Sequence, residues 1–489
     1  MRIALMVLCA LVAAGSVAQQ AEDQPAGPTA LEQLQQASKP TFAEGHTLLP
    51  LSMWMPEQPF EVRKELADNW GYCLRFGRLR PQLVEQLGDP ESVVSKVCDL
   101  TASDPERYPM HVIVAPAFTI RSFRDDLPPQ TWCRDENGEL VEGKRVWSPE
   151  APDEAFEMVA EREIEMLRPV LERAPIAIIT NGGEYGLSTI GHHLEHWQQD
   201  PKVMAAKGDR DWYDYISERK GHQELIVSER IRDLVPDRML YIYYHTEASH
   251  HAHRYADWWK WTWNYDYMKP VSDIPNTSIY YRHYNSGFTG SWDMLTMALN
   301  ATAQQIEYGQ PLSYNWVTAG WPGDNRPDEP IADPARYMGY LKCYYTAGMI
   351  GGVAGYFAYD DAKNWIWQCM ALGRVHALFS HLEDFLRNGD LVPGPDKHIW
   401  SEDLAAYELP TASEGVRVVA RKHRDREEWL ITAWAAGTEA CTVEVEVPEL
   451  GSVALQARPS GSVYRASTED DQPSMRLIDE DGLLPTSGL

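Results

Sequence analysis

Eight short apolar or aromatic runs recur along this chain, and stretches with helical periodicity lie between most of them. Before the fourth run, Phe156, Val159, Ile164, Leu167 and Leu171 follow the spacing of an amphipathic helix. Strands that alternate with helices form parallel sheets, and eight such units over about 330 residues are typical of a (β/α)8 barrel. The runs cover residues 47–54, 72–77, 110–118, 176–181, 239–245, 278–284, 312–317 and 353–359.

The predicted fold class is therefore α/β, a (β/α)8 TIM barrel followed by a small antiparallel β-sandwich. A doubly wound sheet is the alternative, but no G-x-G-x-x-G motif follows the first run. We expect the last barrel helix to end at Asn388-Gly389, a typical helix C-terminus. Past residue 405 the pattern changes to short alternating segments separated by charged or Gly-containing turns, which predicts the sandwich.

The domain boundaries follow from changes in composition. Met1-Arg2, a short apolar run and a small-x-small site that ends at Ala18 are typical of a signal peptide, so we expect a secreted or periplasmic protein. The predicted segments are a signal peptide (1–18), a flexible leader (19–45), the catalytic barrel (46–400), the C-terminal β-sandwich (401–467) and a loose acidic tail (468–489).

Charge and hydropathy exclude several classes of partner. The net charge of -28 argues against nucleic acid, because binding to phosphates requires clustered Lys and Arg. No later segment is apolar enough for a transmembrane span. Six of the seven cysteines remain once Cys9 leaves with the signal peptide; an exported protein could use them for disulfides, or they could be buried thiols.

Aromatic composition points toward a sugar ligand. The chain has 18 Trp and 24 Tyr but only 10 Phe. Trp and Tyr combine an apolar ring with a polar N–H or O–H group, so they are favoured where a ligand has both an apolar face and a hydrated edge. A sugar presents such a surface, although a large exported domain can also bury many Trp in its core.

Carboxylates follow three of the predicted strands. Glu184 comes shortly after the fourth strand, in "TNGGEYG", and Glu247 follows the fifth, in "YHTEASHH". Asp360 follows the eighth strand directly, where it could instead cap the next helix together with Asp361. Barrel enzymes carry their reactive groups at the carboxyl ends of strands, and a pair of carboxyl groups is the minimum needed to hydrolyse a glycosidic bond. Glu184 with Glu247 is the predicted pair, and Asp360 is the alternative partner of Glu184.

Aromatic and basic side chains near the same strand ends are candidates for substrate binding. Several rings in one mouth would line a cleft with stacking platforms, and Arg and His side chains could recognise carboxylate or sulfate groups. The aromatic candidates are Trp54, Tyr185, Tyr244, Trp316, Trp321 and Tyr359, and the polar candidates are Arg75, Arg78, His245, Arg282 and His283. The expected partner is a polysaccharide or oligosaccharide, which could be acidic or sulfated.

The layout and the Asn at the fourth strand resemble the clan of retaining (β/α)8 glycoside hydrolases, whose acid/base Glu follows an Asn there. This resemblance implies that Glu184 donates the proton and that Asn181 binds the sugar 2-hydroxyl. In the clan Asn and Glu are adjacent, whereas Gly182 and Gly183 separate them here. Other sugar-hydrolase barrels carry their two acids on strands four and five, which matches Glu184 and Glu247 and leaves their roles interchangeable.

Two further classes of function stay open. His192, His193 and His196 in "GHHLEHW", with a second cluster in "SHHAHRY", could bind zinc in a metal-dependent hydrolase, although no H-E-x-x-H motif is present. The chain could also be a carbohydrate-binding barrel without catalysis. The leading hypothesis is an exported glycoside hydrolase that needs no cofactor.

Overall fold

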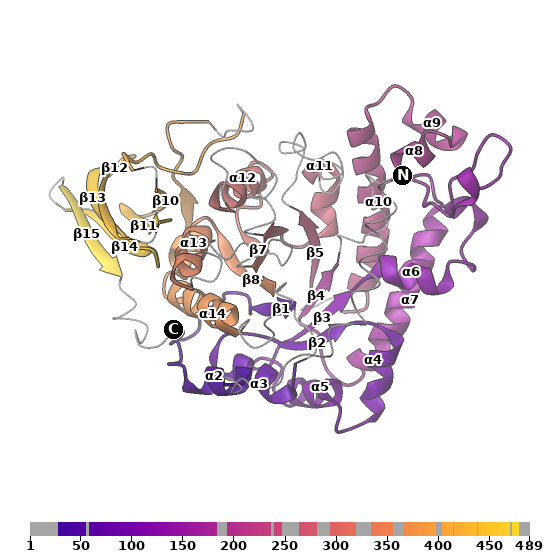
Figure 1. Cartoon of the computed structure of the whole chain (residues 1–489), viewed down its shortest axis with the longest axis horizontal. Helices are drawn as coiled ribbons and strands as arrows, with labels where there is room; N and C mark the ends of the chain where they lie inside the picture. Colours follow the sequence, from indigo (N-terminus) through magenta and orange to yellow (C-terminus); the bar gives the residue numbers. More distant parts are fainter. Residues whose placement is uncertain are drawn as a thin grey trace, which may run out of the picture.

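The computed structural model contains a closed barrel of eight parallel strands (Figure 1). It describes residues 28–54, 58–182, 193–235, 239–246, 264–280, 294–318, 334–355, 366–397, 403–413, 415–437, 439–469 and 472–478. The strands are β1 (Ser52–Trp54), β2 (Leu74–Arg78), β3 (Met110–Val114), β4 (Ile178–Asn181), β5 (Leu240–Thr246), β6 (Asn276–Tyr280), β7 (Ser313–Thr318) and β8 (Met349–Gly355). Strand β1 pairs with β8, and a parallel bridge from Leu51 to Tyr72 joins the β1 side to the β2 side. The predicted TIM barrel is confirmed.

Helices follow the strands and surround the barrel (Figure 1). Asp211 caps the longest of them through its side chain, which accepts a hydrogen bond from the Asp214 amide. Phe156, Val159 and Leu167 are buried as the sequence pattern predicts. The helices are α3 (Phe60–Asn69), α4 (Pro81–Glu85), α5 (Val93–Ser103), α6 (Pro116–Phe123), α7 (Asp153–Leu171), α8 (Leu194–Trp197), α9 (Pro201–Lys207), α10 (Trp212–Arg232), α11 (Tyr265–Met268), α12 (Met294–Glu307), α13 (Pro334–Thr346), α14 (Ile366–Ser380) and α15 (Glu383–Asn388).

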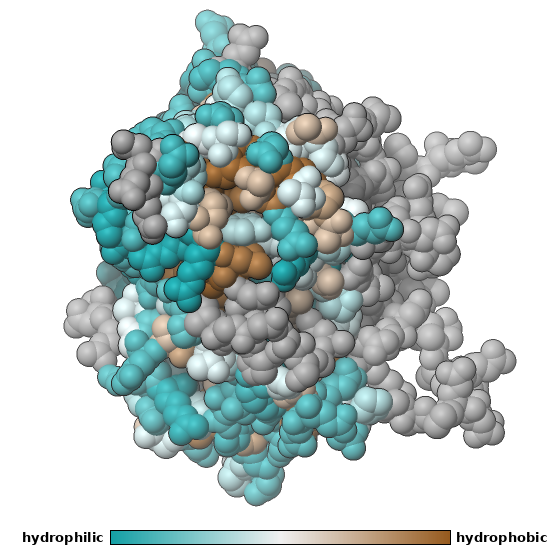
Figure 2. Space-filling view, turned by 90° about the vertical axis from the view of Figure 1, so that its left-hand side faces the viewer, coloured by the Kyte–Doolittle hydropathy of each residue, from teal (hydrophilic) through white to brown (hydrophobic). Residues whose placement is uncertain are grey.

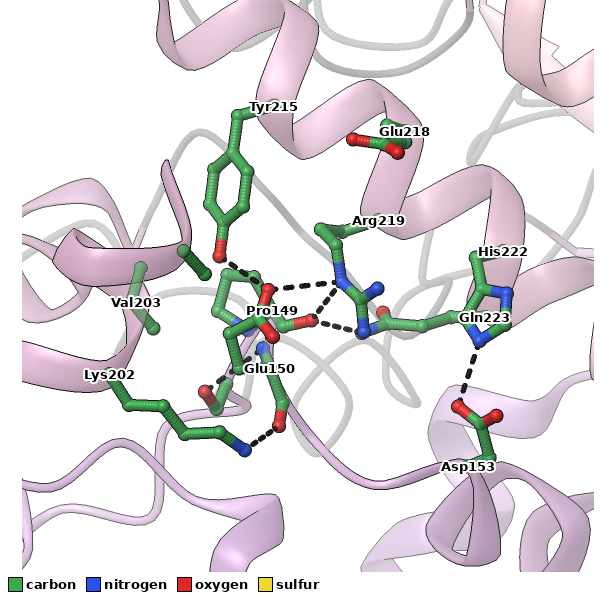
Figure 3. Close-up of polar contacts among 12 residues, drawn as sticks. Pro149, Glu150, Asp153, Lys202, Val203, Tyr215, Glu218, Arg219, His222 and Gln223 are labelled. Carbon is green, nitrogen blue, oxygen red and sulfur yellow. Dashed lines mark hydrogen bonds and ion pairs between the residues drawn. The ribbon is translucent and has the colours of Figure 1, made fainter. Parts of the chain in front are cut away.

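The connection from β3 to α7 and the connection from β4 to α10 pack together beside the barrel. Cys133, Val146, Trp197 and Tyr215 belong to a small core of their own. Figure 3 shows the polar contacts that attach this unit to α10, with Glu150 at their centre. The Tyr215 hydroxyl donates to Glu150 Oε1 at 2.8 Å, and Arg219 Nε lies 3.2 Å from the same oxygen. The two connections therefore share one small core, which polar contacts attach to α10 next to β3 and β4. We call this unit the wall.

The C-terminal domain is a two-layer sandwich. One layer is a five-stranded sheet in the order β15-β14-β11-β10-β9, and the other is the hairpin of β12 and β13. Along β11 the side chains alternate, so Trp429 and Ile431 face the hairpin while Leu430 and Trp434 belong to the core shared with the barrel. The strands are β9 (Gly389–Leu391), β10 (Val416–His423), β11 (Glu428–Ala435), β12 (Cys441–Val447), β13 (Gly451–Ala457), β14 (Ser462–Glu469) and β15 (Gln472–Ile478).

The aromatic side chains of the sandwich are used for packing. Trp429, Trp434 and Tyr464 are all buried. Figure 2 looks onto the side of the molecule where the sandwich lies; most of the coloured surface there is hydrophilic, with hydrophobic residues near the upper middle of the view. These three rings therefore offer no exposed platform for a sugar, which agrees with a packing role for this domain.

The structure corrects the predicted ends of the domains. Residues 30–36, assigned to a flexible leader, form α2 (Ala30–Gln36), which begins with a capping box at Thr29 and buries Leu34 against the barrel. Residues 472–478, assigned to a loose tail, form β15, because Met475 and Leu477 pack against the sandwich core. Strand β9 lies within the predicted barrel segment but belongs to the sandwich sheet.

Two smaller expectations are also settled. The single predicted last helix is divided into α14 and α15, and the second of these ends at Asn388 as expected. Six cysteines are free thiols, and five of these six are buried: Cys73, Cys98, Cys133, Cys343, Cys369 and Cys441. None of the helices in the described part of the chain combines the length and apolar character that a membrane span requires. The predicted signal peptide lies outside the described residues.

Candidate active site

A polar layer lies inside the barrel below the strand ends. His111 on β3 shares a hydrogen bond with the Ser52 hydroxyl through Nδ1 and a second one, of 2.8 Å, with the Thr180 hydroxyl through Nε2. Burial and, to a smaller extent, the positive charge of Arg75 together lower the pKa of His111 to about 3. The imidazole is therefore neutral and ties β1, β3 and β4 together. Sequence reasoning missed this residue; its only signal was one His within an apolar run.

Aromatic residues form the next layer toward the mouth of the barrel. The ring of Trp316 on β7 lies 4.8 Å from that of Trp54 on β1 and 4.7 Å from that of Tyr244 on β5. The Arg75 guanidinium lies 6.0 Å from the Trp54 ring, within cation–π range. A Cβ at Gly355 would come within 2.1 Å of Trp316 Nε1, so only glycine leaves room for the indole. The structure thus brings together four residues that the sequence predicted for substrate binding, and we call them the aromatic layer.

The ends of β4 and β5 are adjacent. Asn181, the last residue of β4, is paired with Tyr243, three residues before the end of β5. Glu184 and Glu247, which follow these strands in the chain, lie outside the described residues. The same holds for the alternative acid and five binding candidates, namely Asp360, Tyr185, Arg282, His283, Trp321 and Tyr359. His245 lies in β5, and only its backbone is described.

The Asn181 side chain is turned toward α10. Its amide nitrogen donates to the Tyr241 hydroxyl at 2.8 Å and, at 3.4 Å, to the carboxylate of Glu224 on α10. Glu224 also accepts a 3.0 Å hydrogen bond from the Tyr243 hydroxyl. These contacts hold the ends of β4 and β5 against α10. The amide nitrogen is thereby engaged on the outer side of the barrel wall, away from the aromatic layer.

Buried charges behind the barrel wall were also missed from the sequence. Burial raises the pKa of Glu163 on α7 to about 7, and a 2.6 Å hydrogen bond from Thr119 partly offsets this effect. Burial lowers the pKa of Lys220 on α10 to about 8, while the charge of Glu224 opposes the change. One feature of the sequence indicates them: Glu163 and Lys220 lie among the buried positions of helices α7 and α10.

The proposed zinc cluster is only partly described. His192 lies outside the described residues. The rings of His193 and His196 are 6.2 Å apart, and His196 Nε2 lies 3.4 Å from Glu142. Among the described residues no group of three His, Cys, Asp or Glu side chains is arranged to hold a metal ion.

Comparisons with known proteins find similarity in fold. No family model matches the sequence, and no curated protein matches it either. A maltogenic α-amylase from Thermotoga neapolitana is 11% identical over 90% of this chain and 89% of its own, with a TM-score of 0.38. An α-amylase from Geobacillus thermoleovorans, solved with acarbose, is 12% identical over 88% of each chain, with a TM-score of 0.40. An endo-β1,6-glucanase is 8% identical over 88% of this chain and 94% of its own, also with a TM-score of 0.40. Fold similarity alone does not transfer an activity, so the function is argued from the residues of this chain.

Proposed function

We propose that this protein is an exported glycoside hydrolase that cleaves a polysaccharide with two carboxyl groups, those of Glu184 and Glu247. The pairing of β4 with β5 supports this pair, because the two acids follow neighbouring strands in the chain. Neighbouring strands lie about 4.8 Å apart. Glycosidases need their two carboxyl groups roughly 5 to 10 Å apart, a separation that side chains from adjacent strand ends can reach.

The observation that carries the proposal is the aromatic layer. Trp54, Tyr244 and Trp316 come from three different strands and meet inside the barrel at the end where the acids follow. Rings that meet at the carboxyl ends of barrel strands suit the C–H faces of a sugar. Among the residues that the structure describes, Trp316 Nε1 meets no hydrogen-bond partner, whereas a buried indole N–H usually has one.

The chemistry divides between the two acids. One carboxylic acid donates its proton to the glycosidic oxygen as the bond to the anomeric carbon breaks. The other, ionised, either attacks that carbon or removes a proton from a water molecule that attacks it. Arg75 supplies a positive charge at this end of the barrel, beside the Trp54 ring. The roles of Glu184 and Glu247 are interchangeable in this scheme.

Export is part of the proposal and rests on residues 1–18, whose composition is typical of a signal peptide. Cleavage near Ala18 would release the mature chain outside the cytoplasm. The net charge of -28 favours solubility there over binding to polyanions.

A carbohydrate-binding barrel without catalysis is the second candidate, because the aromatic layer would serve binding alone equally well. Release of reducing sugar across neutral, uronic and sulfated polysaccharides separates the two functions. A hydrolase releases sugar from at least one of them. A binding protein would be retarded by a polysaccharide in a native gel and release none.

Substitution of the acids tests the catalytic assignment. Glu184→Gln and Glu247→Gln keep the size of each side chain but remove its ionisable proton, and general acid–base catalysis contributes about 10²- to 10⁴-fold to the rate. Each variant should lose at least about a hundredfold in kcat with little change in melting temperature. Glu195→Gln, an exposed glutamate on α8 in the same connection as Glu184, is the matched control. Two fully active variants would end the assignment, and a loss confined to Glu184→Gln would make Asp360 the partner.

A further inference from the structure

Four arginines line one cavity beside the end of β2. The cavity has a volume of about 210 Å³, and a water molecule needs only roughly 10–15 Å³ of such space. It therefore has room for an anionic group together with water. Its lining consists of Arg63, Arg75, Phe76, Gly77, Arg78, Arg80, Leu83, Gln86, Val93 and Val94. We call it the arginine cavity.

The arginine cavity lies at the mouth end of the barrel. Barrel helices run antiparallel to the strands, so each helix begins near the carboxyl ends of the strands. Arg63 is in the first turn of α3, and Val93 and Val94 begin α5. The remaining lining comes from the end of β2 and from α4 with its flanking residues. The N-terminal ends of α3 and α5 add partial positive charge to this region.

A β-bulge in β2 places two of these arginines, Arg75 and Arg78, on the same face of the strand. Arg75 is paired with His111, whereas Gly77 is paired with Val112 and Arg78 with Ile113, so the register shifts by one residue. In a regular strand, residues three apart lie on opposite faces. The extra residue puts Arg75 and Arg78 on the same face of the barrel wall, a common use of bulges near active sites.

Glycine is required at the bulge. Gly77 has φ +133°, which other residues rarely adopt, and a Cβ there would meet Leu83 Cδ2 at 2.9 Å. Arg63 stabilises the bulge, because its guanidinium donates hydrogen bonds to the Arg75 and Phe76 carbonyls. Its Nε also donates to the Gln58 carbonyl at 3.0 Å. The positive charge of Arg63 is thus buried in the wall of the arginine cavity.

The arginine cavity and the aromatic layer share a residue. Arg75 lines the cavity and also lies beside the Trp54 ring. Arg78 is half-buried and Arg80 is exposed, so both can reach a ligand that enters from solvent. Guanidinium groups bind carboxylate, sulfate and phosphate oxygens in a bidentate manner. A sugar stacked on Trp54 would have a substituent within reach of these cations.

We propose that the arginine cavity binds a carboxylate or sulfate group of the polysaccharide, so that the substrate is an acidic glycan. This inference rests on the proposed glycosidase function. It adds that the substrate is negatively charged and that Arg78 and Arg80 bind its anionic group. Arg75 lies between this group and the sugar stacked on Trp54. The anion would bind beside β2, whereas the proposed acids follow β4 and β5.

The test is binding, so that it does not depend on hydrolysis. Retardation in native gels is measured with a sulfated galactan, with the same galactan after desulfation, and with polygalacturonate. Arg78→Gln and Arg80→Gln should each lower the ratio of acidic to neutral affinity at least about tenfold, because each removes a charged bidentate donor. Arg78→Lys keeps the charge but loses the fork of donors, so its ratio should fall between those of wild type and Arg78→Gln.

Arg145→Gln is the matched control, because Arg145 is an exposed arginine that pairs with Asp125 elsewhere on the surface. Its ratio should equal that of wild type. An unchanged ratio in Arg78→Gln and Arg80→Gln, or an equal loss on all glycans, would overturn the inference. Stabilisation of the wild type, but not of Arg78→Gln, by inorganic sulfate without any retention by acidic glycans would also overturn it, since the site would then take a free anion. Retention by acidic glycans without sugar release would support this inference and reject the hydrolase.

Discussion

The Arg75 guanidinium on β2 lies 6.0 Å from the centre of the Trp54 ring on β1, so a positive charge and an aromatic ring are neighbours. One ligand can therefore meet a stacking surface and a positive charge at the same place. Arg75 is itself buried, and burial strengthens the electrostatic interactions of its charge. This pair connects the aromatic layer to the arginine cavity.

Removal of the Trp54 ring should weaken substrate binding more than catalysis. Trp54 is half-buried at the end of β1 and makes no part of the proposed proton transfer. We expect Trp54→Ala to raise KM about tenfold, corresponding to about 1–2 kcal/mol of lost stacking, while kcat changes by less than about threefold. Steady-state kinetics on the polysaccharide that wild type cleaves provides the measurement.

The matched control for this substitution is Trp212→Ala. Trp212 stacks on Trp197 at a ring distance of 6.5 Å in the wall formed by the two long connections, away from the aromatic layer. Its KM should stay within about twofold of wild type. If Trp54→Ala kept the wild-type KM, the aromatic layer would be part of the core only.

Stability should fall with rising pH because of Glu163. Burial raises its folded-state pKa to about 7, above the ordinary 4.5. The contribution of Glu163 is therefore fully present below about pH 4.5 and is lost as the pH rises through about 7. At pH 8 the folded protein contains an ionised buried carboxylate, which lowers the free energy of unfolding by about 3 kcal/mol relative to acidic pH.

Glu163→Gln removes this titration and keeps an oxygen for the Thr119 hydroxyl. Urea unfolding should show the variant close to wild type at pH 5 and more stable than wild type at pH 8. Glu161→Gln, on the same helix and exposed in a surface ion pair with Arg230, should show no such pH-dependent difference. Equal pH dependence in wild type and Glu163→Gln would contradict the prediction.

Arg421 holds the sandwich to the barrel. Its buried guanidinium donates to four backbone carbonyls, those of Thr346, Ala347, Leu386 and Gly389, at distances between 2.6 and 3.1 Å. These carbonyls belong to the ends of α13 and α15, where helix carbonyls lack partners within the helix. Arg421→Met should lower the free energy of unfolding by about 3–5 kcal/mol, because it leaves buried carbonyls without donors.

Chemical denaturation of Arg421→Met and Arg424→Met provides the comparison. Arg424 is three residues away, exposed, and paired with Asp390 on the surface. Surface ion pairs contribute at most about 1 kcal/mol, so Arg424→Met should unfold close to wild type. A small effect in both variants would mean that water replaces the lost donors of Arg421.

The sequence predicted elements wherever burial is periodic along the chain. Phe156, Val159 and Leu167 were assigned to a buried helix face from spacing alone, and the structure has them there. The leader and the tail were assigned wrongly because they are short and polar in composition. Their burial depends on a few residues, Leu34 in α2 and Met475 and Leu477 in β15, that pack on surfaces formed by distant parts of the chain.

The sequence by itself determined the alternation of strands and helices, and with it the barrel, because hydrophobic periodicity is a local property. It also named Trp54, Arg75, Tyr244 and Trp316, since each lies near the end of an expected strand. Only the tertiary structure decided that these four meet, because the barrel closes β1 against β8 and turns alternate residues inward.

Side-chain direction at a strand end was likewise a tertiary matter. Asn181 faces α10 because Glu224 and Tyr241 accept its amide hydrogens there. Arg75 and Arg78 share a face because a bulge shifts the register of β2 against β3. The partners that fix both directions are more than 30 residues away in the chain, as with Arg75 and His111, and no local pattern in a single sequence encodes such contacts.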